Sequence, residues 1–244
     1  MDRQKFQQGL KDGLPICLGY FPVSFAYGMS VVLSGMPAWA AVLISLTNLT
    51  SAGQFAGSSL MLAGGSYLEI AVTTVVINIR YFLMSLAMSQ KTDKKMTWIQ
   101  RLLVSFGITD EIFAVSMQAE GKLTASYMAG LILTPVIGWS GGTLAGGILT
   151  SFLPTILANA LNIALYGMFI AIIVPPARKK KPVLFTVLFA VLLSCCFAYF
   201  PVFSGLSGGW GIIIITIVVS AVAALLFPVE EEEANEEPLY FNQY

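Results

Sequence analysis

The chain has 244 residues, of which 57% are hydrophobic and only 11% are charged, and its formal net charge is zero. This composition is typical of an integral membrane protein and excludes a soluble globular domain or a nucleic-acid-binding protein. Histidine is absent, which excludes imidazole metal sites, histidine-activated nucleophiles and histidine proton relays. Any proton carrier must therefore be a carboxylate. The cysteines lie in apolar segments and predict buried thiols without a disulfide framework.

Eight apolar stretches follow one another and predict an all-α membrane protein with about eight transmembrane segments. They lie at about 13–34, 38–63, 66–88, 102–118, 124–149, 152–175, 183–201 and 206–228. A cytoplasmic segment (1–12) precedes them. A tail rich in glutamate (229–244) follows and is expected to be disordered.

Proline and glycine occur within these stretches and predict kinked or interrupted helices, at Pro22, Gly53, Pro135, Gly138 to Gly147 and Pro154. Three short matches also recur in one order: residues 25–29 with 113–117, 51–60 with 140–149, and 78–84 with 162–168. They predict two copies of three spans, 13–88 and 102–175, joined by a basic loop at 89–101. Since three is odd, the copies form an inverted repeat, as in many secondary transporters. A second basic loop and two additional spans complete the chain at 176–228.

Charged residues lie inside two of these apolar segments. Arg80 lies ten residues before Gln90, at the start of the basic loop, and Asp110 lies nine residues after Arg101. If both segments are helical, both charges lie about 14–15 Å from their shared loop, near the middle of an apolar layer about 30 Å thick. A lone charge there costs at least about 2.5–3.5 kcal/mol. We therefore predict that Arg80 pairs with Asp110 and that Glu111, about 100° around the helix, faces a cavity or a neighbouring helix. The alternatives are snorkelling of Arg80 and a dip of the short fourth segment toward water.

Two motifs of small residues predict the substrate site. Gly53 and Gly57, and likewise Gly142 and Gly146, lie on one helix face, where they serve either close helix packing or a helix interruption. An interrupted helix would point free N–H groups and a positive dipole end at an anionic substrate group. The predicted substrate contacts are Ser51, Gly53, Gln54, Phe55, Asn78, Gly142 and Thr143. For Asn78, a hydrogen bond between helices is the alternative.

Basic residues favour a cytoplasmic N-terminus, although the basic loop after the third span then lies on the outside. A fourth segment that does not fully cross would relieve this violation.

Four motifs resemble the AzlC-type family, the azaleucine-resistance or branched-chain amino acid permease large subunits. Residues 13–15 with 21–28 resemble the opening span, and residues 51–55 are similar to the A-G-x-Q-F element. Residues 78–84 resemble the N-x-R-[HY] element, with Tyr81 where many members have His, and residues 109–114 are similar to the T-D-E element. The likeness covers about residues 8–228. It implies an inner-membrane exporter of branched-chain amino acids that works with a small, separately encoded AzlD-type membrane subunit.

From the residues alone we expect a secondary transporter of small solutes bearing a carboxylate. A channel, or a transporter of another organic or inorganic ion, is the first alternative, and a structural subunit is another. The sequence argues against an intramembrane enzyme, because histidine is absent and no second acid-bearing segment makes a dyad with Asp110. No nucleotide-binding loop or cofactor motif is present.

Overall fold

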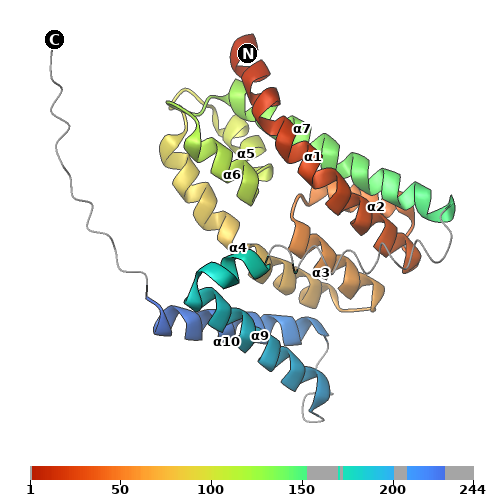
Figure 1. The fold of residues 1–244 in the computed structure, drawn as a ribbon. Coiled ribbons are helices and arrows are strands. Elements are labelled where there is room, and N and C mark those ends of the chain that lie inside the picture. Colours follow the sequence, from red (N-terminus) through yellow and green to blue (C-terminus); the bar gives the residue numbers. More distant parts are fainter. Residues whose placement is uncertain (1, 153–169, 171–172, 201–207, 229–244) are drawn as a thin grey trace.

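The computed structural model describes residues 2–152, 170, 173–200 and 208–228, and all its named elements are helices (Figure 1). Within this part, five helices are long and apolar enough to cross a membrane: α1 (Arg3–Leu33), α4 (Tyr67–Lys91), α7 (Ala125–Leu149), α9 (Lys181–Tyr199) and α10 (Gly208–Leu226). The shorter elements are α2 (Ala38–Thr47), α3 (Ser51–Leu62), α5 (Trp98–Phe106), α6 (Asp110–Gln118) and the 3₁₀ turn η1 (Thr150–Phe152). The helical membrane fold is confirmed. Most of the sixth predicted segment, including residues 162–168, and the acidic tail lie outside the described residues.

Helices α1 and α7 lie side by side and run in the same direction (Figure 1). Glycines make this contact close. A Cβ at Gly13 would meet the carbonyl of Leu131, and one at Gly146 would meet the backbone of Phe25. Small residues let two helix backbones approach in this way. The fifth segment is not interrupted, because α7 is one continuous helix whose glycines pack against α1, and the first is not interrupted either, because α1 continues through Pro22.

The second segment is broken at residues 48–50 into α2 and α3, three residues before Gly53, from which an interruption was predicted. Ala38 lies near Gly147 at the end of α7, and α3 then runs back along α4, with Gly53 near Asn78 and Gly57 near Thr74. Both ends of this α2–α3 hairpin therefore lie at the end of the bundle where α1 and α7 finish.

The fourth segment is broken at residues 107–109 into α5 and α6. Its two ends meet beside the end of α4, because the amide of Asp93 donates to the Leu123 carbonyl (2.9 Å) and the amide of Leu123 donates to the Lys91 carbonyl (3.0 Å). The amide of Asp2 also donates to Ser126 Oγ (2.9 Å), which brings the N-terminus to the same place. The α5–α6 hairpin therefore enters and leaves at the N-terminal end of the bundle (Figure 1).

These two hairpins correct the expected eight crossings, since neither the second nor the fourth segment passes through the bundle. Hydropathy and length did not distinguish a span from a hairpin, because both bury a similar apolar stretch. The sequence matches also paired a broken segment with the unbroken α7, and the unbroken α1 with the broken α5–α6. The matched residues are helical in both members of each pair, but the segments that contain them differ, since one is continuous and the other is broken.

The hairpins also remove the violation in the charge distribution. The loops and helix ends at the N-terminal end carry Lys91, Lys94, Lys95, Arg101 and Lys122, together with Arg3 and Lys5 at the start of α1. The loops at the opposite end, 34–37 and 63–66, carry no charged residue. Because basic loops stay in the cytoplasm, this distribution predicts that the N-terminal end of the bundle is the cytoplasmic end.

Helices α9 and α10 form an antiparallel pair beside α3 and α4, and Phe185 near the start of α9 packs on Phe227 after α10. Glu69 joins this pair to the rest of the bundle. Its buried carboxylate accepts a hydrogen bond from the amide of Gly209 at the start of α10 (2.9 Å). An acid at a helix N-terminus is favourably placed in the helix dipole.

Candidate functional site

A cavity of about 570 Å³ lies where the tips of the two hairpins approach each other between α1, α4 and α7. Its lining includes four of the residues predicted from sequence, namely Ser51, Arg80, Asp110 and Glu111. The rest of its wall is largely apolar and aromatic, and comprises Pro15, Ile16, Gly19, Tyr20, Val23, Ala52 and Trp139. This volume and lining are typical of a site for a small molecule.

The ion pair predicted from helical depth is present. Arg80 Nη2 lies 2.7 Å from Asp110 Oδ2, and the guanidinium also lies over the ring of Tyr81, 5.1 Å from its centroid. The side chains of Arg80 and Asp110 keep 52% and 38% of their surface exposed, so the pair faces the cavity rather than a dry core. Asp110 still lies far from the loop that joins its segment to α4, as predicted. Helix α5 extends from that loop up to the break, so the hairpin carries Asp110 inward as a transmembrane helix would.

The two acids occupy the first turn of α6. Thr109 caps this helix, since its Oγ1 accepts from the amide of Ile112 (3.3 Å). The carboxylates of Asp110 and Glu111 then lie at the positive end of the helix dipole, which stabilises their charge. Gly107, just before the cap, packs against Ile132 of α7, where a larger residue would clash. The break in the fourth segment therefore serves to present acids at the cavity.

Tyr20 on α1 joins the acidic tip to the aromatic wall. Its hydroxyl lies 2.7 Å from Thr109 Oγ1 and also hydrogen-bonds Glu111 Oε2. Its ring meets that of Trp139 edge to face, with centroids 5.3 Å apart. Tyr20 thus holds Glu111 in one place while closing the cavity on the α1 side.

The tip of the other hairpin presents the N-terminus of α3. Ser51 and Ala52 line the cavity at the first turn, and the cap residue Thr50 makes no side-chain hydrogen bond to the first-turn amides. Thr50 Oγ1 instead donates to Asn48 Oδ1 (2.7 Å) and accepts from Asn78 Nδ2 (3.3 Å). Asn78 fits there because Gly53 has no side chain. This tip presents a positive dipole end without an acid of its own.

A buried polar network supports the wall behind the cavity. Gln54 Nε2 donates to Ser45 Oγ (2.6 Å), and Gln54 Oε1 accepts from Trp139 Nε1 (2.8 Å). Ser45 in turn hydrogen-bonds Thr143 (2.7 Å). Gln54 and Thr143 are buried, so they tie α2, α3 and α7 together and fix the indole of Trp139.

The predicted residues thus fall into three groups. Ser51, Arg80, Asp110 and Glu111 line the cavity, whereas Gly53 and Asn78 shape the tip of the α2–α3 hairpin. The remaining residues pack helices together: Gln54 and Thr143 through the polar network, Gly142 against Phe21, and Phe55 against Tyr27 with ring centroids 5.0 Å apart. Sequence reasoning missed Tyr20, Thr109 and Trp139. The threonine immediately before two acids was a capping signal that pointed to the start of a helix.

Long apolar helices, hairpins that enter from opposite ends and an ion pair at mid-depth define a multi-pass α-helical membrane protein. The chain belongs to the AzlC family. The family model, described as AzlC protein, matches residues 15–153, which is more than half of the chain.

Curated relatives agree with this assignment. The inner membrane protein YgaZ of Escherichia coli is 26% identical over 185 residues, covering 72% of this chain and 75% of YgaZ. An uncharacterized membrane protein of Archaeoglobus fulgidus is 31% identical over 178 residues, covering 72% of this chain and 77% of the relative. One from Helicobacter pylori is 24% identical over 230 residues, covering 91% and 96%. No solved structure matches the chain.

Proposed function

We propose that this protein is a secondary transporter that exports branched-chain amino acids, namely leucine, isoleucine, valine and their analogues, across the cytoplasmic membrane. The observation that carries the proposal is the charge layout of the cavity. The N-terminus of α3 supplies a positive end at Ser51, and α6 supplies acids at Asp110 and Glu111 on the same cavity wall. A free amino acid has one charge of each sign within a few ångströms and fits this layout.

The carboxylate of the substrate is assigned to the start of α3. Its first-turn amides receive no hydrogen bond from the side chain of the cap residue Thr50. The N-terminus of a helix binds anions through such amides and through its dipole. Ser51 adds a hydroxyl at the same place.

The ammonium group of the substrate is assigned to Glu111. Asp110 forms a salt bridge with Arg80, whereas Glu111 accepts a hydrogen bond from Tyr20 and forms no salt bridge with the described residues of the cavity lining. Tyr20 holds it by a single hydrogen bond, which leaves a carboxylate oxygen to accept from an ammonium. The aliphatic side chain would then contact Ile16, Val23 and Trp139.

We also propose that the export is ion-coupled and uses an alternating-access mechanism. The two hairpins enter from opposite ends and meet at the cavity, which supports an inverted relation between α1 with α2–α3 and α4 with α5–α6. Transporters with inverted halves expose a mid-membrane site to each side in turn. Buried apolar clusters lie around Tyr127 toward the cytoplasmic end and around Met36 toward the other end.

Membership of the AzlC family supports two further proposals, localisation in the cytoplasmic membrane and a small AzlD-type partner subunit. The test is leucine flux in proteoliposomes, with and without the partner and at two pH values. We expect saturable exchange of labelled leucine that Glu111→Gln abolishes and that Glu120→Gln, in the exposed loop before α7, leaves unchanged. Equal flux in both variants would reject the assignment. Flux that does not saturate would indicate a channel.

A further inference from the structure

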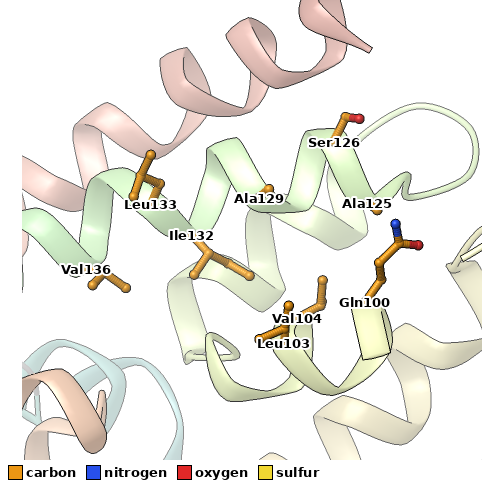
Figure 2. Close-up of a pocket in the computed structure, with 9 residues that line it drawn as sticks. All are labelled: Gln100, Leu103, Val104, Ala125, Ser126, Ala129, Ile132, Leu133 and Val136. Atoms are coloured by element: carbon orange, nitrogen blue, oxygen red, sulfur yellow. The ribbon is translucent and has the colours of Figure 1, made fainter. Parts of the chain in front are cut away.

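A second cavity lies away from the substrate site, in the groove between α5 and α7. It has a volume of about 390 Å³ (Figure 2). Leu103 and Val104 of α5 form one wall, and Ile132, Leu133 and Val136 of α7 form the other. Ala129 belongs to the α7 wall, between Ser126 and Ile132, and its small side chain leaves the groove open. The groove lies on the membrane-embedded part of the chain, so a molecule that binds there must be soluble in the hydrocarbon layer of the bilayer.

The length and polarity of the groove match one acyl chain. Gln100 and Ser126 lie at its cytoplasmic mouth, and Val136 lies ten residues further along α7. Ten helical residues extend about 15 Å, and half of the hydrocarbon layer of a bilayer is about 15 Å thick. Trp98, 74% exposed at the start of α5, lies at the level where tryptophan anchors helices at the membrane surface. The polar mouth is therefore at headgroup depth.

Basic residues surround that mouth. Lys122 lies four residues before Ser126, where its ammonium donates to the Gln90 carbonyl (3.1 Å), and Lys94 and Lys95 lie in the loop before Gln100; all three side chains are exposed. Arg3 follows Asp2, whose amide donates to Ser126 Oγ. Three acids lie at this end: Asp2 caps α1 by accepting from the Gln4 and Lys5 amides, Asp93 accepts from the Lys95 amide, and Glu120 is exposed in the loop before α7, so the basic residues outnumber them. The mouth is thus suited to an anionic headgroup.

We propose that the α5–α7 groove binds one anionic phospholipid of the cytoplasmic leaflet, with an acyl chain between the two apolar walls and its phosphate near Lys94, Lys95 and Lys122. This site is separate from the proposed transport site. Its occupant supports the α5–α6 hairpin, because α5 has no buried residue of its own and leads directly to Asp110.

The test is native mass spectrometry of the delipidated full-length chain titrated with phosphatidylglycerol or with phosphatidylcholine of the same acyl chains. Wild type should bind one phosphatidylglycerol about tenfold more tightly than phosphatidylcholine, since each nearby basic residue contributes to attraction of an anionic headgroup. Ala129→Trp should fill the groove and lose this binding. The matched Ile137→Trp, on the exposed lipid-facing side of α7 but outside the groove, should keep it.

A second groove variant, Leu103→Trp from the opposite wall, covers the case in which Ala129→Trp does not fold. Lys94→Gln combined with Lys122→Gln should remove the preference for phosphatidylglycerol over phosphatidylcholine. Both lipids should then bind with the weaker affinity that wild type has for phosphatidylcholine. Equal affinity of wild type for both lipids would overturn the headgroup assignment. Unchanged phosphatidylglycerol binding in folded groove variants would show that the lipid does not bind in the groove. A dimer mass that the groove variants abolish would also overturn the proposal, because it would assign the groove to a second copy of the chain.

Discussion

Arg80 on α4 and Asp110 at the start of α6 form a salt bridge of 2.7 Å at the point where the α5–α6 hairpin reaches the middle of the bundle. The pair joins a long helix to the tip of a hairpin that only partly crosses the membrane. It therefore holds the acidic end of the cavity against α4, and its loss would release the hairpin tip that carries Glu111.

Exchanging the two charges tests this link. Arg80→Asp should abolish leucine transport, because two acids then face each other where a lone charge already costs at least about 2.5 kcal/mol. Adding Asp110→Arg should restore part of the flux. The recovery stays partial because an arginine in the first turn of α6 opposes the helix dipole. Flux in proteoliposomes, normalised to the amount of folded protein, measures both variants. A double exchange no better than the single one would show that the contact has no role in transport.

Tyr20→Phe removes the hydroxyl that holds Glu111 and keeps the ring that packs on Trp139. We expect the KM for leucine to rise by about tenfold or more, since a hydrogen bond to a charged group contributes about 1.5–3 kcal/mol. Tyr27→Phe is the matched control, because Tyr27 hydrogen-bonds Ser58 away from the cavity. That control should lower thermal stability slightly and leave KM unchanged. The reverse pattern, with KM altered only in Tyr27→Phe, contradicts the role given to Tyr20.

The positions Gly141 and Gly142 separate packing from substrate binding. A methyl group at Gly142 would meet the Phe21 carbonyl and Ser24 of α1, whereas one at Gly141 meets nothing within 4 Å. Gly142→Ala should lower the melting temperature, and Gly141→Ala should leave it unchanged or raise it, because alanine favours a helix by up to about 1 kcal/mol over glycine. Thermal unfolding in detergent measures both. If Gly142→Ala is as stable as wild type but fails to bind leucine, Gly142 belongs to the site and not to the helix contact.

Single cysteines in a cysteine-free background test the two hairpins. Lys94→Cys before α5 and Lys122→Cys after α6 should be labelled by a membrane-impermeant reagent from the same, cytoplasmic side. Gly64→Cys, in the loop after the α2–α3 hairpin, should be labelled from the opposite side. Labelling in intact cells and in inverted vesicles distinguishes the sides. Opposite accessibility of residues 94 and 122 would mean that the fourth segment crosses after all.

Sequence reasoning predicted the helical membrane class and the Arg80–Asp110 pair because both follow from the number of residues along a segment. Apolar length sets the number of candidate segments, and helical rise sets the depth of a charge. It did not predict that the fourth segment turns back, because that depends on three residues, Gly107 to Thr109, and on hydrogen bonds between loops distant in sequence. The short length of the fourth segment and the failure of the charge rule at the loop before Trp98 offered it only as an alternative.

The glycine motifs show a second limit. Gly53 and Gly142 belong to similar sequences, yet one lies beside a helix break and the other lies inside a continuous helix. The difference comes from the neighbours: Asn78 and Thr50 hydrogen-bond at the break near Gly53, while α1 covers α7 along its length. Tyr20 was missed for a related reason. It is an ordinary aromatic residue in a long apolar helix until the hairpin tip is brought beside it.

The most direct measurement compares binding of leucine and of 4-methylpentanoate, which lacks the ammonium group, to wild type and to Glu111→Gln. Wild type should bind leucine at least about tenfold more tightly, since the ammonium gains a charge-assisted hydrogen bond. Glu111→Gln, if it elutes as a monodisperse folded protein, should bind both ligands equally. A Glu111→Gln variant that still prefers leucine by the same factor would place the ammonium elsewhere and would contradict a cavity in which helix α6 binds the positive end of an amino acid.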